Sequence, residues 1–570
     1  MPRRLHLALV PLVAVAALSL LPACGGPDHD LIIRNGTIYD GSGGEPYAGS
    51  LAVDGDSIVA VADSLPDVRG RREVDASGMA VAPGFINMLS WGSDELMHDG
   101  RGLSDLRQGV TLEVFGEGAS LGPLTDSMRA RRERNQNDIR YEITWSTLSG
   151  GLEVLAERGV SPNVASFVGA TTVREHVLGH ACRPPTDAEL DRMQELVRRA
   201  MEGGALGVGS SLIYEPAFCA TTGELTALAA AAGEYGGMYV SHIRSEGNRV
   251  LESIGELIRI SREADVRAEV YHLKASGERN YAKLDTAIRM IERARADGPP
   301  ITANIYTYVA SSTGLDASMP PWVQEGGEEA WLERLRDPGV RKKVAAEMND
   351  ADAEWDNTYA AAGTPDDILL ASFDVDSLDR YAGRTLAEVA EVRGTAPEQT
   401  AMDLVLQNGG DVQAIYFTMS EENLKKKIRQ PWVSWCSDAS ALAPEGVFLD
   451  SHPHPRAYGS FARLLGRYVR EEGVIPLAEA VRRLTSLPAE NLRLERRGRL
   501  AAGNYADIVV FDPDRVRDHA TFEEPHQLAT GVEHVIVNGV RVIRDGSHTG
   551  ATPGRVVRGP GWTGESRGGG

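Results

Sequence analysis

The sequence predicts an α/β protein, a (β/α)8 TIM-like barrel with a small β-sandwich built from both terminal segments. The chain has 570 residues, which is enough for a barrel and an accessory unit. Its middle alternates strand-like with helix-like runs, as is typical of a parallel sheet. Both ends carry short β-rich runs broken by Asn-Gly and Asp-Gly turns. We expect the sandwich to comprise residues 25–80 and 495–550, and the barrel residues 81–494.

The first 24 residues predict a signal peptide with a lipobox, outside the folded domain. Arg3 and Arg4 precede an apolar run over 7–21, and the segment Leu-Pro-Ala leads to Cys24. A basic start and a short apolar core are typical of a secretory signal, and the run is shorter than the ~20 residues of a comfortable membrane span. A cysteine at the cleavage point predicts an exported bacterial lipoprotein, periplasmic or at the cell surface, which meets the membrane only through a lipid on Cys24. The alternative is a plain signal peptide with an incidental cysteine.

The net charge bears on possible partners, and the cysteine residues bear on metal motifs and disulfides. The net charge of −22 argues against nucleic acid and against anionic membrane surfaces. Cys182, Cys219 and Cys436 match no metal-ligand motif, and their odd number argues against a disulfide framework. One pair could form in an oxidising compartment, and the sequence leaves open which.

The terminal segments are strand-like. The run over 30–81 is echoed by 506–513 and 532–546, so both ends are expected to build the sandwich together. The last residues, 551–570, are rich in Gly, Arg and Pro and predict a loosely held tail.

Eight candidate strands alternate with amphipathic helices in the middle of the chain, the number found in a (β/α)8 barrel. Two of the helices open with capping-box patterns, at 186–189 and 221–224. Further strand-like runs and the helical stretch 328–350 predict an insertion over about 318–425 that could cover the site. The candidate strand ends are Asn87, Glu117, Ala170, Leu212, His242, His272, Tyr308 and Asp438.

Functional side chains of such a barrel belong at the carboxyl ends of its strands. His242 and His272 lie 30 residues apart, one strand–helix–strand repeat, so two imidazoles should meet at one level and could share a metal. Glu117, between two glycines, supplies a third ligand, and two His with one Glu form a known catalytic zinc set. The alternatives are hydrogen-bonded structural histidines and a solvated loop glutamate.

Asp438 follows the last strand and faces the expected metal. A carboxylate there suits a general base that takes a proton from attacking water and passes it to the leaving nitrogen. The alternative is an Asx-turn or a helix cap.

Together with these residues, several motifs give the chain a family resemblance: QGVT at 108–111, GALGVGSSLIY at 204–214, SHIRSE at 241–246, YHLKASG at 271–277, IYTYVASSTGL at 305–315 and SDASALAPEG at 437–446. The chain resembles the amidohydrolase superfamily and, within it, the D-aminoacylase or N-acyl-D-amino-acid deacylase family. The resemblance implies the barrel fold, zinc at the strand ends, and deacylation of small N-acyl-D-amino acids. In that family a cysteine holds the tighter metal, and Glu117 stands in its place, a harder donor.

The resemblance also implies residues that contact substrate. Lys274 matches a family lysine, and Tyr306 or Tyr308 could donate to the amide oxygen. Arg244 and Arg456 could each grip a substrate carboxylate through a bidentate guanidinium. Ordinary salt bridges are the alternative.

The family's His-x-His pair falls on Leu89 and Trp91, so the weaker metal position has no ligands here. We therefore expect one zinc ion, with Trp91 as an aromatic wall. Two other hypotheses remain: an exported binding lipoprotein that has lost catalysis, and a hydrolase of cyclic amides or dipeptides. The latter ranks lower because we find no convincing lysine at a strand end to bridge two metals.

Overall fold

The computed structural model describes residues 27–136 and 138–564. The expected signal peptide over 1–24, with Cys24, lies outside these residues and stays a prediction. No helix in the described ranges is both long and apolar enough to cross a membrane.

Parallel strands alternate with helices in the middle of the chain, in the order of a (β/α)8 barrel. They form the runs β6-β7-β8 and β9-β10-β11-β12-β13-β17. Their bounds are β6 (Phe85–Asn87), β7 (Val110–Phe115), β8 (Asn163–Ser166), β9 (Val168–Gly169), β10 (Gly207–Ser211), β11 (Met238–His242), β12 (Ala268–Val270), β13 (Ile301–Ile305) and β17 (Val433–Trp435).

The two runs meet at both of their ends. Only Phe167 separates β8 from β9, so these two segments occupy one strand position and the predicted number of eight is confirmed. At the other junction the Met88 N–H donates to the Trp435 carbonyl, and Ser90 forms a parallel bridge with Ala439. The last strand therefore lies beside the first.

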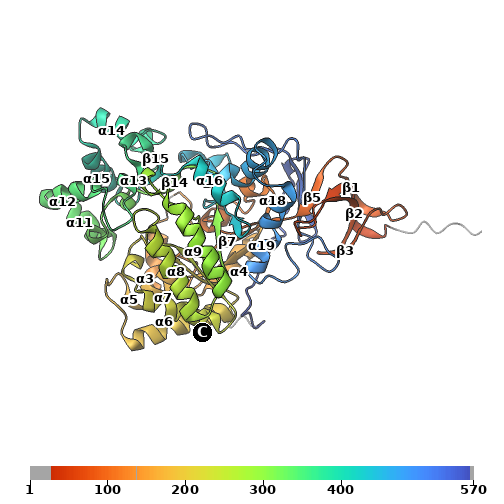
Figure 1. The fold of residues 1–570 in the computed structure, drawn as a ribbon, viewed down its shortest axis with the longest axis horizontal. Coiled ribbons are helices and arrows are strands. Elements are labelled where there is room, and N and C mark those ends of the chain that lie inside the picture. Colours follow the sequence, from red (N-terminus) through yellow and green to blue (C-terminus); the bar gives the residue numbers. More distant parts are fainter. Residues whose placement is uncertain (1–26, 137, 565–570) are drawn as a thin grey trace, which may run out of the picture.

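Helices that follow the strands pack side by side around them (Figure 1). The capping box of α6 (Asp187–Glu202) forms as predicted, with Thr186 and Glu189 satisfying each other's backbone N–H. At α7 (Thr222–Gly233) the Thr221 side chain accepts from the Glu224 N–H. The helices in this layer are α4 (Leu148–Arg158), α5 (Ala170–Leu178), α6, α7, α8 (Val250–Ala264), α9 (Lys283–Asp297), α16 (Glu421–Ile428) and α18 (Leu477–Leu484).

Both ends of the chain build one β structure, as predicted, at one end of the molecule (Figure 1). The strands form a single nine-stranded sheet rather than two separately bonded sheets, because β5 pairs with β1 on one side and with β18 on the other. Its strands are β1 (His29–Ile38), β2 (Tyr47–Asp54), β3 (Ser57–Ala62), β4 (Gly70–Asp75), β5 (Ala80–Pro83), β18 (Ile508–Phe511), β19 (Val532–Val537), β20 (Val540–Arg544) and β21 (Ser547–His548).

The expected loose tail over 551–570 is wrong for its described part. The Gly554 N–H donates to the Val160 carbonyl and the Gly559 N–H to the Gly204 carbonyl, just before β8 and β10. Val557 is buried there. Backbone hydrogen bonding and two adjacent valines hold this segment across the amino ends of the strands, although its composition is typical of a tail.

The insertion forms a compact unit at the opposite end of the molecule from the terminal sheet (Figure 1). It contains a three-stranded antiparallel sheet of β14 (Ser311–Gly314), β16 (Gln413–Tyr416) and β15 (Ile368–Ser372). Leu335, Ile368, Met402 and other side chains form its own hydrophobic core. Its helices are α10 (Pro321–Gln324), α11 (Glu328–Leu335), α12 (Pro338–Met348), α13 (Thr358–Ala362), α14 (Leu386–Arg393) and α15 (Pro397–Asn408).

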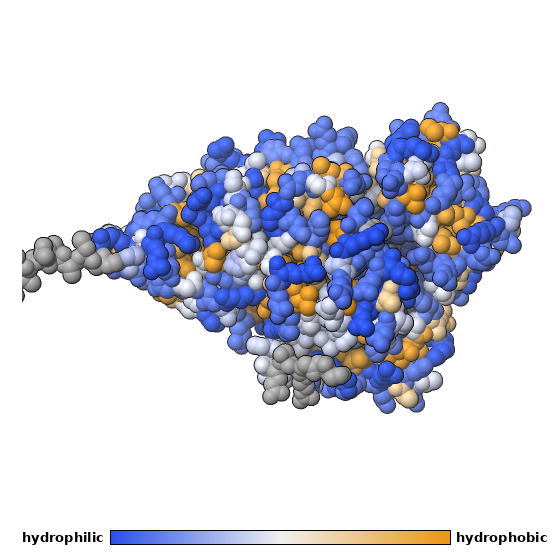
Figure 2. Space-filling view, turned by 180° about the vertical axis from the view of Figure 1, so that it is seen from behind, coloured by the Kyte–Doolittle hydropathy of each residue, from blue (hydrophilic) through white to orange (hydrophobic). Residues whose placement is uncertain are grey.

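One disulfide joins Cys182 to Cys219, with their Cα atoms 5.3 Å apart, and Cys436 is buried and free. This identifies the pair that the sequence left open. The face seen in Figure 2 is mainly hydrophilic with small scattered hydrophobic areas, in keeping with the net charge of −22.

Candidate active site

A cavity of about 850 Å³ opens at the carboxyl ends of the barrel strands. Its walls come from the barrel and from the insertion, so the insertion does cover part of the site. Seven of the ten predicted site residues line it: Glu117, His242, His272, Lys274, Asp438, Trp91 and Arg456. The other three, Arg244, Tyr306 and Tyr308, are not among the residues that line it.

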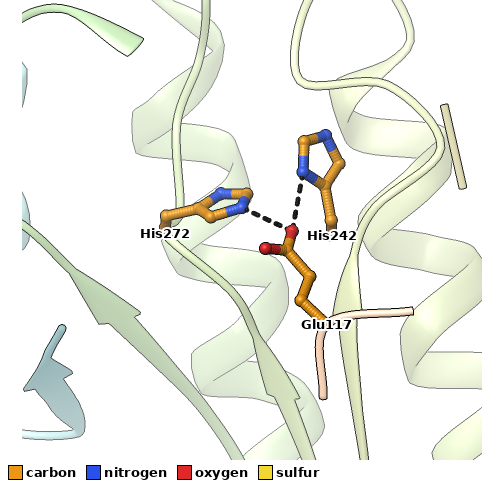
Figure 3. A group of neighbouring side chains, drawn as sticks. All are labelled: Glu117, His242 and His272. Carbon is orange, nitrogen blue, oxygen red and sulfur yellow. Dashed lines mark hydrogen bonds and ion pairs between the residues drawn. The ribbon is translucent and has the colours of Figure 1, made fainter. Parts of the chain in front are cut away.

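Glu117, His242 and His272 converge on one point, as predicted (Figure 3). The Glu117 Oε1 atom lies 3.0 Å from His242 Nδ1 and 3.1 Å from His272 Nε2. All three side chains are buried. Burial would raise the pKa of Glu117, but the two imidazoles outweigh it and hold this pKa well below its usual range.

Glycines shape the turn that presents Glu117. Gly116 and Gly118 have φ of +107° and +71°. A Cβ on Gly116 would lie 2.4 Å from the Phe167 carbonyl oxygen, and one on Gly118 would lie 2.8 Å from Ser211 Cβ. Only glycine fits both positions, so the backbone can pass close to the neighbouring strands while the glutamate points into the cavity.

His272 and Asp438 are non-glycine residues in the left-handed region, with φ of +33° and +51°. Such backbone strain persists only where the surroundings enforce it. The His272 N–H donates to Asn304 Oδ1 at 2.7 Å, and the Asp438 N–H donates to the Leu89 carbonyl at 2.9 Å. These bonds direct both side chains toward the cavity.

The three converging residues fit a zinc ion. Their ligand atoms all lie within 4.8 Å of one another, and two imidazoles with one carboxylate are a donor set that zinc takes in catalytic sites. The second ring nitrogen of His272, Nδ1, lies 2.8 Å from Glu246 Oε1. A carboxylate behind a ligating histidine is the usual partner that orients its ring.

Glu246 is a site residue that sequence reasoning missed. Besides His272 it contacts Lys274, whose Nζ lies 2.8 Å and 2.9 Å from its two carboxylate oxygens. Lys274 is thus buried and ion-paired with Glu246, which was the alternative to a contact with substrate. The sequence offered one indication of this role, because Glu246 follows His242 by four residues in SHIRSE.

His242, Glu246 and Asp356 form a second group of possible ligands. Lys274 occupies the Glu246 carboxylate, and Asp356 Oδ1 accepts hydrogen bonds from Ser245 Oγ and from the backbone N–H groups of Glu246 and Gly247. Asp356 thereby attaches the insertion to the loop after β11. Protein donors already satisfy these carboxylates, so we assign this group a structural role.

Asp438 is held from both sides. Its Oδ2 atom forms an ion pair with Arg456 at 2.6 Å, and its Oδ1 atom accepts the indole N–H of Trp91 at 3.3 Å. The Arg456 guanidinium in turn lies 4.6 Å from the ring centroid of Tyr306. Leu89 is fully buried, and Trp91 is 40% exposed at the cavity wall. Neither a leucine nor an indole side chain offers a metal ligand.

Two of the residues predicted to contact substrate, Arg244 and Tyr308, are bound by other side chains of the protein. Arg244 pairs with Glu256 at 3.0 Å and donates to two backbone carbonyls. The Tyr308 hydroxyl donates to Asp518 at 3.2 Å, beneath the guanidinium of Arg463. Neither residue lines the cavity, because partners on the outside of the strand ends bind both side chains.

A buried polar network supports the Asp438 loop and was also missed. The Asn87 Nδ2 atom lies 3.1 Å from Asp105 Oδ1, 3.0 Å from Glu113 Oε2 and 2.8 Å from Ser437 Oγ. The Asn87 Oδ1 atom accepts the backbone N–H of Ser437. Burial raises the pKa of Asp105 to about 7 and that of Glu113 well above its usual range.

A sequence profile described as the amidohydrolase family matches residues 139–543, which is more than half of the chain. The chain belongs to the amidohydrolase family. It is 32% identical to the D-aminoacylase and to the N-acyl-D-glutamate deacylase of Alcaligenes xylosoxydans xylosoxydans, over 93% of its own length and 97% and 96% of theirs.

Solved structures agree with this membership. The N-acyl-D-glutamate deacylase of Bordetella bronchiseptica, in complex with zinc and a phosphonate mimic of the tetrahedral intermediate, is 31% identical, with a TM-score of 0.76 over 93% of this chain and 99% of that one. A D-aminoacylase described as having a binuclear metal centre, with one-metal activation and second-metal attenuation, is 30% identical, with a TM-score of 0.77 over 93% and 100%. This amidohydrolase is an enzyme, and its three converging residues could hold a metal ion.

Proposed function

We propose that this amidohydrolase deacylates N-acyl-D-amino acids and uses one zinc ion held by Glu117, His242 and His272. The convergence of these three side chains beside Asp438 carries the proposal. The names of the relatives support the substrate class. A panel of N-acetyl-D- and N-acetyl-L-amino acids, with released acetate as the readout, tests it; turnover of the L-series alone, or of none, would contradict it.

Zinc, when bound, supplies Lewis-acid polarisation of the scissile carbonyl and lowers the pKa of water. Asp438 takes the proton of the attacking water and returns it to the leaving nitrogen. Arg456 and Trp91 fix the two oxygens of Asp438 for this role. Tyr306 is not among the residues that line the cavity, but it lies against the cavity-lining Arg456. Its hydroxyl is buried without a hydrogen-bond partner among the described residues and suits a donor to the amide oxygen.

Arg456 suits a second task. Its Nε–H is buried and has no hydrogen-bond partner in the described part of the chain. A substrate carboxylate that accepts this hydrogen bond would sit next to Asp438 and would place the scissile amide beside the general base. Lys274 acts indirectly, because its ammonium group holds the Glu246 carboxylate against the His272 ring.

The single-metal proposal rests on Leu89 and Trp91. We expect purified protein to bind one zinc per chain, and excess zinc to cause no attenuation, because an indole and a leucine offer no ligands. Mass spectrometry of metal content and a zinc titration of activity measure this. Leu89→His/Trp91→His should gain a second ion, whereas Trp91→Phe, the matched control, should still bind one. Two zinc ions per native chain would contradict the proposal.

The alternatives have less support. A retired binding protein has no need of an intact ligand triad with an oriented aspartate beside it. For cyclic amides or dipeptides a bridging lysine is expected, but among the described residues the only lysine that lines the cavity is Lys274, which Glu246 binds.

We also propose that the protein is an exported lipoprotein. The pattern of residues 1–24 supports this, and the Cys182–Cys219 disulfide suits an oxidising compartment. Labelling of expressing cells with radioactive palmitate should mark the protein, and Cys24→Ser should abolish the label. Equal labelling of that variant would contradict the anchor.

A further inference from the structure

The cavity wall is strongly unbalanced in charge. Ten carboxylate residues line it against two lysine or arginine residues, Lys274 and Arg456. Each of these cations is already paired, with Glu246 and Asp438 respectively. The carboxylate residues are Asp94, Glu95, Glu117, Glu215, Glu246, Asp316, Glu328, Asp356, Asp411 and Asp438.

Four of these carboxylates come from the insertion; Asp356 contacts the loop after β11, and the other three form one wall. Asp316 lies in the short helix Leu315–Ser318, Glu328 begins α11, and Asp411 precedes β16. A Cβ built on Gly314 would lie 2.1 Å from Asp316 Oδ1 and 2.9 Å from Asp411 Oδ1, so these oxygens face one small volume. Burial and the charge of Asp411 raise the pKa of Asp316 to about 7. Among the described residues no ion pair reaches Asp316 or Asp411, although Gln413 donates to both oxygens of Asp411 and the positive charge of Arg131 acts on Glu328.

Independent atoms in the same cavity point to a polar ligand. Ser211 Oγ, Thr418 Oγ1 and Trp331 Nε1 have no hydrogen-bond partner among the described residues. Their residues are 3%, 1% and 6% exposed. Trp331 is on α11, three residues after Glu328 and so on the same side of that helix. Buried polar groups are normally hydrogen-bonded, and the two hydroxyl oxygens can accept from an ammonium or guanidinium group. The Trp331 N–H only donates, so it needs an acceptor elsewhere on the substrate.

We propose that the insertion wall of Asp316, Glu328 and Asp411 selects N-acyl amino acids whose side chain carries a positive charge, such as arginine, lysine or ornithine. This rests on the proposed function, because the side chain must extend from an amide placed at the zinc ligands. An acidic side chain would meet like charge at this wall. The preference would therefore be opposite to those named for the relatives that act on N-acyl-D-glutamate and N-acyl-D-aspartate.

Two substrates of matched shape isolate the charge. N-acetyl-D-arginine and N-acetyl-D-citrulline have side chains of equal length, and only arginine is charged. We expect kcat/KM to be at least about 10-fold higher for the arginine compound and the ratio to fall as salt screens the wall. N-acetyl-D-glutamate should be the poorest of the three. Equal or faster turnover of the citrulline or glutamate compound would overturn the proposal.

Variants locate the effect in the wall. Asp316→Asn/Asp411→Asn should bring the arginine-to-citrulline ratio toward one, with thermal unfolding confirming that the variant is folded. Glu329→Gln removes an exposed carboxylate on the same helix as Glu328 but outside the cavity, and should leave the ratio unchanged. An unchanged ratio in the double variant would overturn the assignment.

Failure of the proposed function has a different signature. In that case no compound would be hydrolysed, including neutral N-acetyl-D-leucine. The charge proposal is then decided by binding, measured as the shift in Tm of the zinc-loaded protein. A larger shift in Tm with N-acetyl-D-arginine than with N-acetyl-D-citrulline would support selection of positive charge by the insertion wall. Equal shifts would overturn the proposal.

Discussion

Replacement of Asp438 with asparagine is expected to lower kcat by about 10²- to 10⁴-fold, the usual contribution of a positioned general base. The amide keeps the size of the side chain but cannot take a proton from water. Zinc content should stay at the native value, because Asp438 is not one of the three converging ligands. Steady-state kinetics and metal analysis of the same sample measure both quantities.

Arg456→Lys serves as the companion to Asp438→Asn. Lysine keeps the positive charge but loses the planar guanidinium that lies over Tyr306 and beside Asp438. We expect KM for the acylated amino acid to rise together with a fall in kcat, because Arg456 both orients the base and suits the substrate carboxylate. Native turnover in Asp438→Asn would remove Asp438 from the mechanism, whatever the result with Arg456→Lys.

Replacement of Glu117 with alanine is expected to weaken zinc binding by at least about 10²-fold, more than is usual for loss of an outer-shell partner. The carboxylate is the one anionic member of the set, and its Oε1 atom lies between both ring nitrogens. Removal leaves two imidazoles that must bind the ion alone. Competition with a chromogenic chelator gives the Kd.

Two further substitutions test whether the loss of zinc affinity is specific to a ligand at position 117. Glu117→Cys should retain zinc, because a thiolate is also a good zinc ligand, although the turn must adapt to the shorter side chain. Glu215→Gln, which removes another cavity carboxylate outside the ligand set, should leave the Kd unchanged. Native zinc affinity in Glu117→Ala would show that the three residues do not form the metal site.

Residue spacing made the convergence of Glu117, His242 and His272 predictable. Strands β11 and β12 are neighbours in a parallel sheet, so histidines one strand–helix–strand repeat apart had to reach the same edge. Glu117 was predictable for a similar reason, because it stands between two glycines at the end of β7. These inferences needed only the order and direction of strands.

Side-chain partners could not be predicted in the same way. Arg244 lies two residues from His242, and Lys274 two residues from His272, yet Lys274 lines the cavity and Arg244 pairs with Glu256 outside it. The difference arises beyond the strand ends, where irregular backbone breaks the alternation of faces. Glu246 was missed because its partners, Lys274 and His272, belong to another strand.

The sequence by itself determined the order of strands, the shared β structure of the two ends, the three residues that converge at the strand ends and the loss of the family's His-x-His pair at Leu89 and Trp91. These features depend on local periodicity and on the identity of single residues. Only the tertiary structure decided that Trp91 donates to Asp438 and that the segment after 550 is packed. It also showed that the insertion brings Asp316 and Asp411 to the cavity. Such contacts join residues far apart in the chain, and neither periodicity nor composition specifies which side chains meet.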